Sequence, residues 1–253
     1  MKQSQQVSSG IDPLCETLPF DRPRVPSEVE GWSGLKLAAL WSIGFCIFAT
    51  LLLSPHIGHS GDEADRALTL VRKTYASLVG LKADFIQTEE RPGVGVSVRE
   101  EGVLSFSPPD RMRWDYSGKR PHAVVINNSK VWIHTPSRNQ VVVRELTPQE
   151  MRRGAATFLS GLEGIEEDFT VQSRMTGPGE SIPLDLFPLE DNLPYDKISI
   201  LVASDSGLVE RIVIHHKLGN VTTITFQGIK TGVKLADEIF EWNIPEGTEV
   251  IEP

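Results

Sequence analysis

The side chains that could carry out chemistry in this sequence are few, and their spacing matches no familiar catalytic or metal-binding motif. His215 and His216 are adjacent, and adjacent residues of a strand point to opposite faces of a sheet, so the two imidazoles cannot both ligate one metal ion. Beyond residue 60 there is no GxSxG, HExxH, P-loop or GxGxxG motif. We therefore predict that the protein is not an enzyme and that it holds neither a metal nor a cofactor.

Cysteine usage and net charge exclude further classes of function. The two cysteines are Cys15 and Cys46, so disulfide scaffolds, Cys-ligated zinc and Cys nucleophiles are excluded from the rest of the chain. The 25 Lys and Arg residues against 34 Asp and Glu residues give a formal net charge of -9. Nucleic-acid binding requires a local excess of basic residues, so we expect no nucleic-acid partner.

The N-terminal region contains an export segment. Leu37–Leu53 is a run of 17 uncharged, mostly apolar residues, between the length of a signal-peptide core (about 7–15 residues) and that of a membrane-spanning helix (about 20 residues). Residues 37–60 are therefore either a signal peptide cleaved after Ser60 or a retained inner-membrane anchor. Residues 1–36 form a disordered leader or reflect a start codon placed too far upstream. In either case we expect residues 61–253 to form one domain in the periplasm.

The order of elements in residues 61–253 predicts a mainly β, α+β domain. An amphipathic helix is expected over 62–80, followed by short alternating strands joined by tight turns, which favour an antiparallel sheet. Thr147, Pro148 and Glu150 match a capping box and predict a second helix to about residue 159 or 162. Gly177–Pro194 is rich in Gly and Pro and predicts a long loop. We expect a strongly curved half-barrel whose concave face the helices cover.

Large apolar side chains recur in the strands and in the second helix. For each of them, ordinary core packing is the simplest interpretation. Together, in a half-barrel with few covering helices, they could also line an apolar cavity that binds acyl chains. Burial of an acyl chain is favourable by about 0.8 kcal/mol per methylene, so such a site needs no specific hydrogen bonds.

Four runs of residues, in this order and spacing, resemble the periplasmic outer-membrane lipoprotein carrier (LolA-like) family: Ala83–Gln87, Glu101–Leu104, Pro109–Tyr116 and Val131–Ile133. The ending Phe240-x-Trp242-x-x-Pro245-x-Gly247 is also similar to the close of that family. The resemblance implies a half-barrel of about eleven strands with a helical lid over a cavity for lipoprotein acyl chains. It also implies a monomeric carrier that moves acylated lipoproteins from an inner-membrane exporter to an outer-membrane acceptor lipoprotein.

The apolar pattern of the strands and the resemblance together give candidate roles to particular residues. We expect the acyl cavity to be lined by Val71, Tyr75, Leu81, Phe85, Leu104, Phe106, Met112, Trp114, Trp132, Phe158, Leu159 and Phe226. The family often has an arginine that helps to hold the lid closed where this sequence has Pro108. Arg111 and Arg113 are therefore candidates for the lid latch, or for a patch that docks an acidic partner. The alternative function is a membrane-anchored lipid-binding or sensor module of the same fold in envelope stress regulation.

Overall fold

The structure, a computed structural model, describes residues 60–153, 155–174 and 176–252. The expectations for the leader and the export segment concern residues before 60 and lie outside this part of the chain. The predicted cleavage position after Ser60 lies at its first residue. None of the helices in the described residues is long and apolar enough to cross a membrane.

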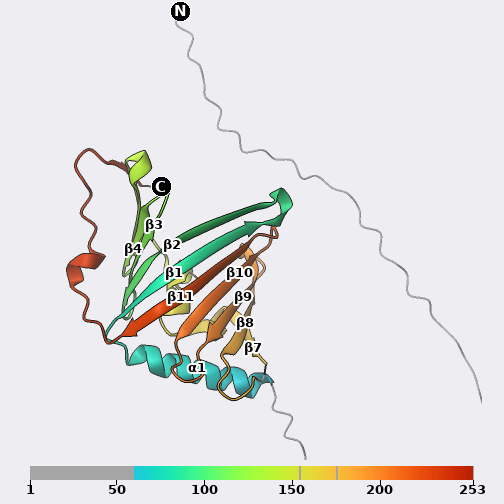
Figure 1. The fold of residues 1–253 in the computed structure, drawn as a ribbon. Coiled ribbons are helices and arrows are strands. Elements are labelled where there is room, and N and C mark those ends of the chain that lie inside the picture. Colours follow the sequence, from blue (N-terminus) through green and yellow to red (C-terminus); the bar gives the residue numbers. More distant parts are fainter. Residues whose placement is uncertain (1–59, 154, 175, 253) are drawn as a thin grey trace, which may run out of the picture. The chain divides into compact units, whose positions relative to one another are not determined.

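The described residues form one open, curved sheet of twelve strands (Figure 1). Its strand order is β12-β6-β5-β4-β3-β2-β1-β11-β10-β9-β8-β7. This confirms the predicted curved, mainly β architecture, with one strand more than expected. The strands are β1 (Leu81–Arg91), β2 (Val96–Ser107), β3 (Arg111–Ser117), β4 (His122–Asn127), β5 (Lys130–Thr135), β6 (Gln140–Glu145), β7 (Phe169–Ser173), β8 (Ile182–Pro188), β9 (Tyr195–Val202), β10 (Val209–His216), β11 (Val221–Thr231) and β12 (Glu249–Ile251).

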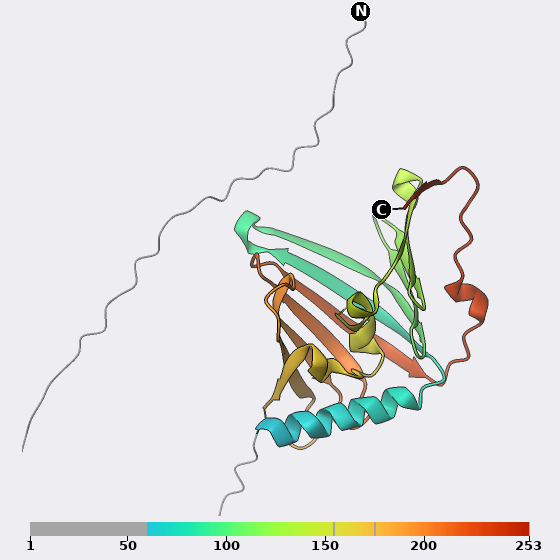
Figure 2. The ribbon, with the colours of Figure 1, turned by 180° about the vertical axis from the view of Figure 1, so that it is seen from behind.

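Two sets of helices accompany the sheet. The α-helices are α1 (Ser60–Ala76), α2 (Pro148–Arg153) and α3 (Ala155–Leu159), and the short 3-10 helices are η1 (Pro92–Val94), η2 (Pro136–Arg138), η3 (Ile165–Glu167) and η4 (Asp237–Phe240). Figure 2 shows α2 and α3 inside the curve of the sheet, with α1 along one end of the strands. We call the face toward α2 and α3 the concave face.

The alternation of side chains along β1 defines this face. Leu81, Ala83 and Phe85 are buried, whereas Lys82 and Asp84 are exposed, as expected for a strand with one buried face. Residues paired across antiparallel strands share a face, so the register shows which residues of each neighbouring strand lie on the concave face.

Position 102 of β2, which lies between β1 and β3, requires glycine. It pairs with Phe85 on one side and Tyr116 on the other. A Cβ at this position would lie 2.1 Å from the Asp115 carbonyl oxygen and 2.8 Å from Phe85 Cζ. Only glycine leaves room for the Phe85 ring and for the close approach of β3.

Helix α1 is amphipathic, as predicted, but it ends at Ala76 instead of near Gly80. Gly80 lies in the turn that leads into β1, where a Cβ would come within 2.4 Å of the Val233 carbonyl oxygen. The buried side chains of the helix recur at three- and four-residue spacing and join the main core. They are Ala64, Ala67, Leu68, Val71 and Tyr75.

The loop predicted for Gly177–Pro194 is wrong over residues 182–188, which form β8 between β7 and β9. Ile182, Leu184 and Leu186 are buried on the concave face. Proline is rare in strands with neighbours on both sides because it cannot donate to the ladder. Pro183 and Pro188 occupy the second and last positions of β8, so its central hydrogen bonds remain.

After β11 the chain crosses the convex face of β3 and β4 and then pairs with the edge of the sheet (Figure 1). We call residues 232–251 the C-terminal strap. Its last residues form β12, which pairs with β6 in parallel, opposite Gln140–Val142. This is the twelfth strand, and every other neighbouring pair in the sheet is antiparallel. Three residues are too short a run for the sequence pattern to reveal.

Candidate functional site

The concave face carries one continuous apolar cluster, and this cluster is the candidate site. It contains eleven of the twelve residues predicted to line an acyl cavity. They are Val71, Tyr75, Leu81, Phe85, Leu104, Phe106, Met112, Trp114, Phe158, Leu159 and Phe226, all buried. In this closed arrangement their side chains pack against one another and form a core.

Aromatic rings form the centre of the cluster. Phe85 meets Trp114 edge to face, with ring centroids 4.9 Å apart, and it meets Tyr116 in the same way at 4.9 Å. Trp114 also lies 6.0 Å from Phe226. Edge-to-face pairs contribute about 0.5–1.5 kcal/mol each beyond area burial. The rings therefore form a stable apolar floor across β1, β3 and β11.

The helical lid comprises residues 147–168, of which residue 154 is not described. The predicted capping box is confirmed at its start: the Thr147 amide donates to Glu150 at 2.8 Å, and the Glu150 amide donates to Thr147 Oγ1 at 3.2 Å. The predicted helix is divided into α2 and α3. Phe158, Leu159 and Leu162 from the lid are buried in the cluster.

Arginines tie the lid to its surroundings. Arg72 on α1 donates to the Leu162 carbonyl at 3.1 Å and to Glu166 Oε2 at 2.6 Å. Within the lid, Arg152 donates to Asp168 Oδ2 at 3.1 Å. The sequence pattern does not reveal Arg72 as a lid contact. Its position on the polar side of an amphipathic helix gave no signal, because its partner is 90 residues away.

Polar groups replace apolar ones toward the free end of the β1–β2 hairpin. The Tyr116 hydroxyl donates to Gln87 Oε1 at 2.9 Å, and its ring stacks on His122 with centroids 3.9 Å apart. Burial, together with the nearby Glu100 carboxylate, raises the pKa of Tyr116 to about 12. The concave face is therefore amphipathic, with an apolar floor that ends in a polar rim.

Tyr75 joins α1 to β10 inside the apolar part. Its hydroxyl oxygen accepts a hydrogen bond from the Val209 amide at 3.3 Å. Burial raises the pKa of Tyr75 to about 12, and the hydrogen bond from Val209 opposes this only in part. The phenol is therefore neutral at physiological pH and suits an apolar site.

Trp132 is the predicted cavity residue that the structure does not bring to the cluster. It pairs with Val125, which in turn pairs with Arg113. This register places Trp132 on the convex face, where the Lys130 amine lies 5.3 Å from its ring centroid. The sequence identifies the strand but not which of its two faces is concave, and a shift of one residue reverses the face.

Arg111 and Arg113 do not contact the lid, which corrects their assignment as latch candidates. Both alternate with Met112 and Trp114 and therefore point to the convex face. Arg111 forms an ion pair with Asp237 and lies over the Phe240 ring at 5.2 Å. Arg113 donates to the Ile239 carbonyl at 3.2 Å and lies over Trp242. They hold the C-terminal strap in place.

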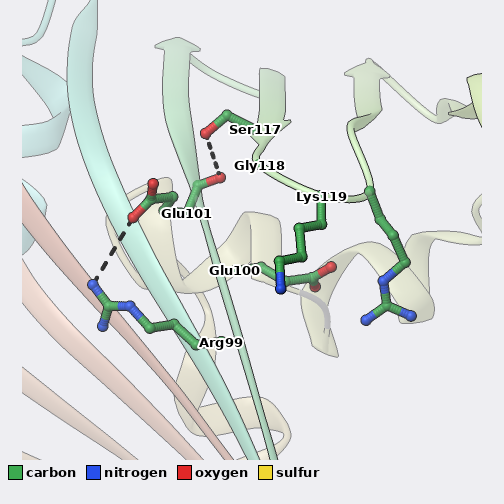
Figure 3. Close-up of a pocket in the computed structure, with 7 residues that line it drawn as sticks. Arg99, Glu100, Glu101, Ser117, Gly118 and Lys119 are labelled. Atoms are coloured by element: carbon green, nitrogen blue, oxygen red, sulfur yellow. Dashed lines mark hydrogen bonds and ion pairs between the residues drawn. The ribbon is translucent and has the colours of Figure 1, made fainter.

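A pocket of about 370 Å³ lies at the β3–β4 turn, outside the apolar cluster (Figure 3). It is lined by Arg99, Glu100, Glu101, Ser117, Gly118, Lys119 and Arg120. Arg99 is paired with Glu101 at 3.9 Å, and the Ser117 hydroxyl donates to the Glu101 carbonyl at 3.1 Å. Acidic and basic groups largely offset each other here, so this pocket does not select a ligand of one charge.

Comparison with known proteins assigns the chain to a family. The family model for the outer membrane lipoprotein carrier protein LolA matches residues 76–243. An outer-membrane lipoprotein carrier protein from Alkalilimnicola ehrlichii is 26% identical over 211 residues, which cover 83% of this chain and 95% of the relative. One from Methylobacillus flagellatus is 27% identical over 178 residues, or 70% of this chain and 84% of the relative.

Solved structures match this chain at lower sequence identity. The crystal structure of a LolA superfamily protein from Nitrosomonas europaea has a TM-score of 0.44 and 13% identity, and the match covers 71% of this chain and 97% of that one. The family model covers more than half of the chain, including β1–β11 and the lid. The chain therefore belongs to the LolA family of outer membrane lipoprotein carrier proteins.

Proposed function

We propose that this protein binds the acyl chains of lipoproteins on its concave face and carries them through the periplasm from the inner to the outer membrane. The observation that carries the proposal is the continuous apolar cluster on the concave face, to which the helical lid contributes. Relatives named as outer-membrane lipoprotein carrier proteins support the same role.

The closed structure suggests how cargo enters. Phe158, Leu159 and Leu162 of the lid occupy the concave face, so an acyl chain must displace them. Opening the lid exposes these side chains to water, which is unfavourable in proportion to their apolar area. Binding of an acyl chain restores the burial, at about 0.8 kcal/mol per methylene. The exchange of one apolar surface for another leaves a moderate net affinity, which suits a carrier that must release its cargo.

The same proposal gives the protein its partners and its location. An acylated lipoprotein must be received from an inner-membrane exporter and passed to an outer-membrane acceptor, because its acyl chains are insoluble in the aqueous space between them. We propose that Leu37–Leu53 directs export to the periplasm. N-terminal sequencing of the exported protein distinguishes cleavage after Ser60 from a retained anchor.

Mass spectrometry of natively purified full-length protein tests the proposal. We expect bound acylated lipid or lipoprotein in the wild type, and loss of this ligand in Trp114→Asp, which places a charge in the apolar floor. Phe226→Ala is the second variant, in case the charge prevents folding. Recovery of folded wild-type protein without acylated ligand from cells that contain lipoproteins, together with no uptake of added lipopeptide, would overturn the proposal.

A further inference from the structure

The convex face of β8–β10 carries a pocket on the side of the sheet opposite the apolar cluster. The pocket has a volume of about 220 Å³ and is lined by Arg174, Pro183, Asp185, Lys197, Ser199, Ile200, Leu201, Arg211 and Val213. The concave-face positions of β9 and β10, Ile198, Ile200 and Ile212, are buried in the core. The intervening Lys197, Ser199 and Arg211 therefore face away from the lid.

Strand register brings three cations around this pocket. Arg211 pairs with Leu201, and Leu201 pairs with Pro183. Arg174 directly follows the β7 residue Ser173, which pairs with Leu184, so Arg174 lies next to Pro183. The two arginines thus stand at opposite ends of one row across β7–β10, and Lys197 lies along β9 from that row.

The single carboxylate in the pocket is already engaged. Asp185 accepts a hydrogen bond from the Ser199 hydroxyl and lies 3.7 Å from Lys197 Nζ. In the described part of the chain, neither Arg174 nor Arg211 forms an ion pair. The neighbouring Glu210 carboxylate accepts a hydrogen bond from the Ser181 hydroxyl at 2.6 Å. The pocket therefore presents two uncompensated guanidinium groups in a protein whose formal net charge is -9.

Other pockets of the same protein have a smaller excess of cations or none. The pocket between the strap and β1–β3 contains Lys82, Arg113 and Lys234 with Asp115 and Glu238, and its Arg113 is bonded to Asp115 at 2.8 Å. The pocket over Gly102 is lined by three carboxylates, those of Asp84, Glu101 and Asp115, and by no cation. Among these pockets, the β8–β10 pocket thus has the largest excess of cations over carboxylates, three against one.

We propose that this pocket binds a phosphate group. Guanidinium groups donate pairs of parallel hydrogen bonds to phosphate oxygens and remain charged at any physiological pH. A volume of about 220 Å³ accommodates a phosphate and several waters, each of which occupies about 30 Å³. The source is either free phosphate or a phospholipid headgroup. This site does not depend on acyl-chain binding, since it lies on the other face of the sheet.

The first arm of the test uses inorganic phosphate and full-length protein. Broadening of the phosphorus resonance of phosphate is expected with the wild type and with Arg138→Gln, which removes an exposed arginine of the distant turn between β5 and β6. The double variant Arg174→Gln/Arg211→Gln should bind about 100-fold more weakly, at about tenfold for each charged contact. Arg174→Lys/Arg211→Lys should lie between them, because charge remains while paired hydrogen bonding is lost.

The second arm identifies the source with vesicles of phosphatidylglycerol in phosphatidylcholine. A lipid headgroup is indicated if the wild type binds these vesicles more strongly than vesicles of pure phosphatidylcholine and the double glutamine variant loses this excess. The double variant and Arg138→Gln both contain the apolar segment Leu37–Leu53. A comparison of these two variants therefore cancels any vesicle binding by that segment. Binding of phosphate without this excess indicates free phosphate. Equal phosphate broadening in the wild type and the folded double variant, or none in either, overturns the proposal.

Discussion

Arg72 Nη2 donates to the Leu162 carbonyl at 3.1 Å and thereby joins the helix along one end of the sheet to the lid that covers its concave face. The same guanidinium pairs with Glu166. Arg111 and Arg113, the two latch candidates, hold the strap instead. Among the described residues, Arg72 therefore provides a polar contact that joins α1 to the lid.

Arg72→Gln should loosen the lid without unfolding the sheet. Both partners of the ion pair are partly exposed, so solvent screens their attraction. We therefore expect the free energy of lid opening to fall by only about 1 kcal/mol. Amides of α3 should then exchange with deuterium about fivefold faster. Arg66→Gln is the matched control, since Arg66 is largely exposed on the same helix. Equal exchange in both variants would show that Arg72 does not hold the lid.

Gly102→Ala should destabilise the whole domain, because the new methyl group collides with the Asp115 carbonyl and the Phe85 ring. We expect a loss of about 2–4 kcal/mol in the free energy of unfolding. Gly93→Ala, in the turn between β1 and β2, has open space for its methyl group and should be nearly neutral. Chemical denaturation of the two variants measures this difference in the free energy of unfolding. Equal stability would mean that β2 and β3 separate easily.

Tyr75 predicts a specific loss of stability at alkaline pH. Its pKa is raised from 10.0 to about 12 in the folded state, so the folded protein holds this proton more tightly than the unfolded chain does. The resulting stabilisation, about 3 kcal/mol, is complete below pH 10 and is lost as the pH rises to about 12. Denaturation at a series of pH values should show a smaller alkaline loss in Tyr75→Phe. The same loss in both proteins would refute the assignment.

The strap should be released when its arginines are removed. Arg111→Ala/Arg113→Ala loses the ion pair with Asp237 and the cation–π contacts with Phe240 and Trp242. We expect limited proteolysis to cut residues 232–248 earlier than in the wild type, while α3 retains its protection. Arg138→Ala provides the control. Unchanged cleavage of the strap would indicate that β12 and the burial of Phe240 hold it unaided.

The sequence predicted the curved antiparallel sheet well, because alternation in runs such as Arg111–Tyr116 depends on local residue order. It did not predict β8, because Pro183 and Pro188 favour a loop. Trp132 was assigned to the wrong face, since the face of a strand depends on its register with its neighbours. Arg72 could not be found either, because its partners Leu162 and Glu166 approach only after the lid folds over the sheet.

The most direct test of the central claim is the binding of a diacylated lipopeptide to delipidated full-length protein, followed by tryptophan emission. Trp114 lies in the apolar floor and Trp132 on the convex face, so they report on opposite sides of one sheet. We predict saturable binding with an emission change that Trp114→Phe abolishes and Trp132→Phe retains, and no change with the unacylated peptide. No binding by the folded protein, or a change that depends on Trp132 and not on Trp114, would contradict an acyl-binding concave face.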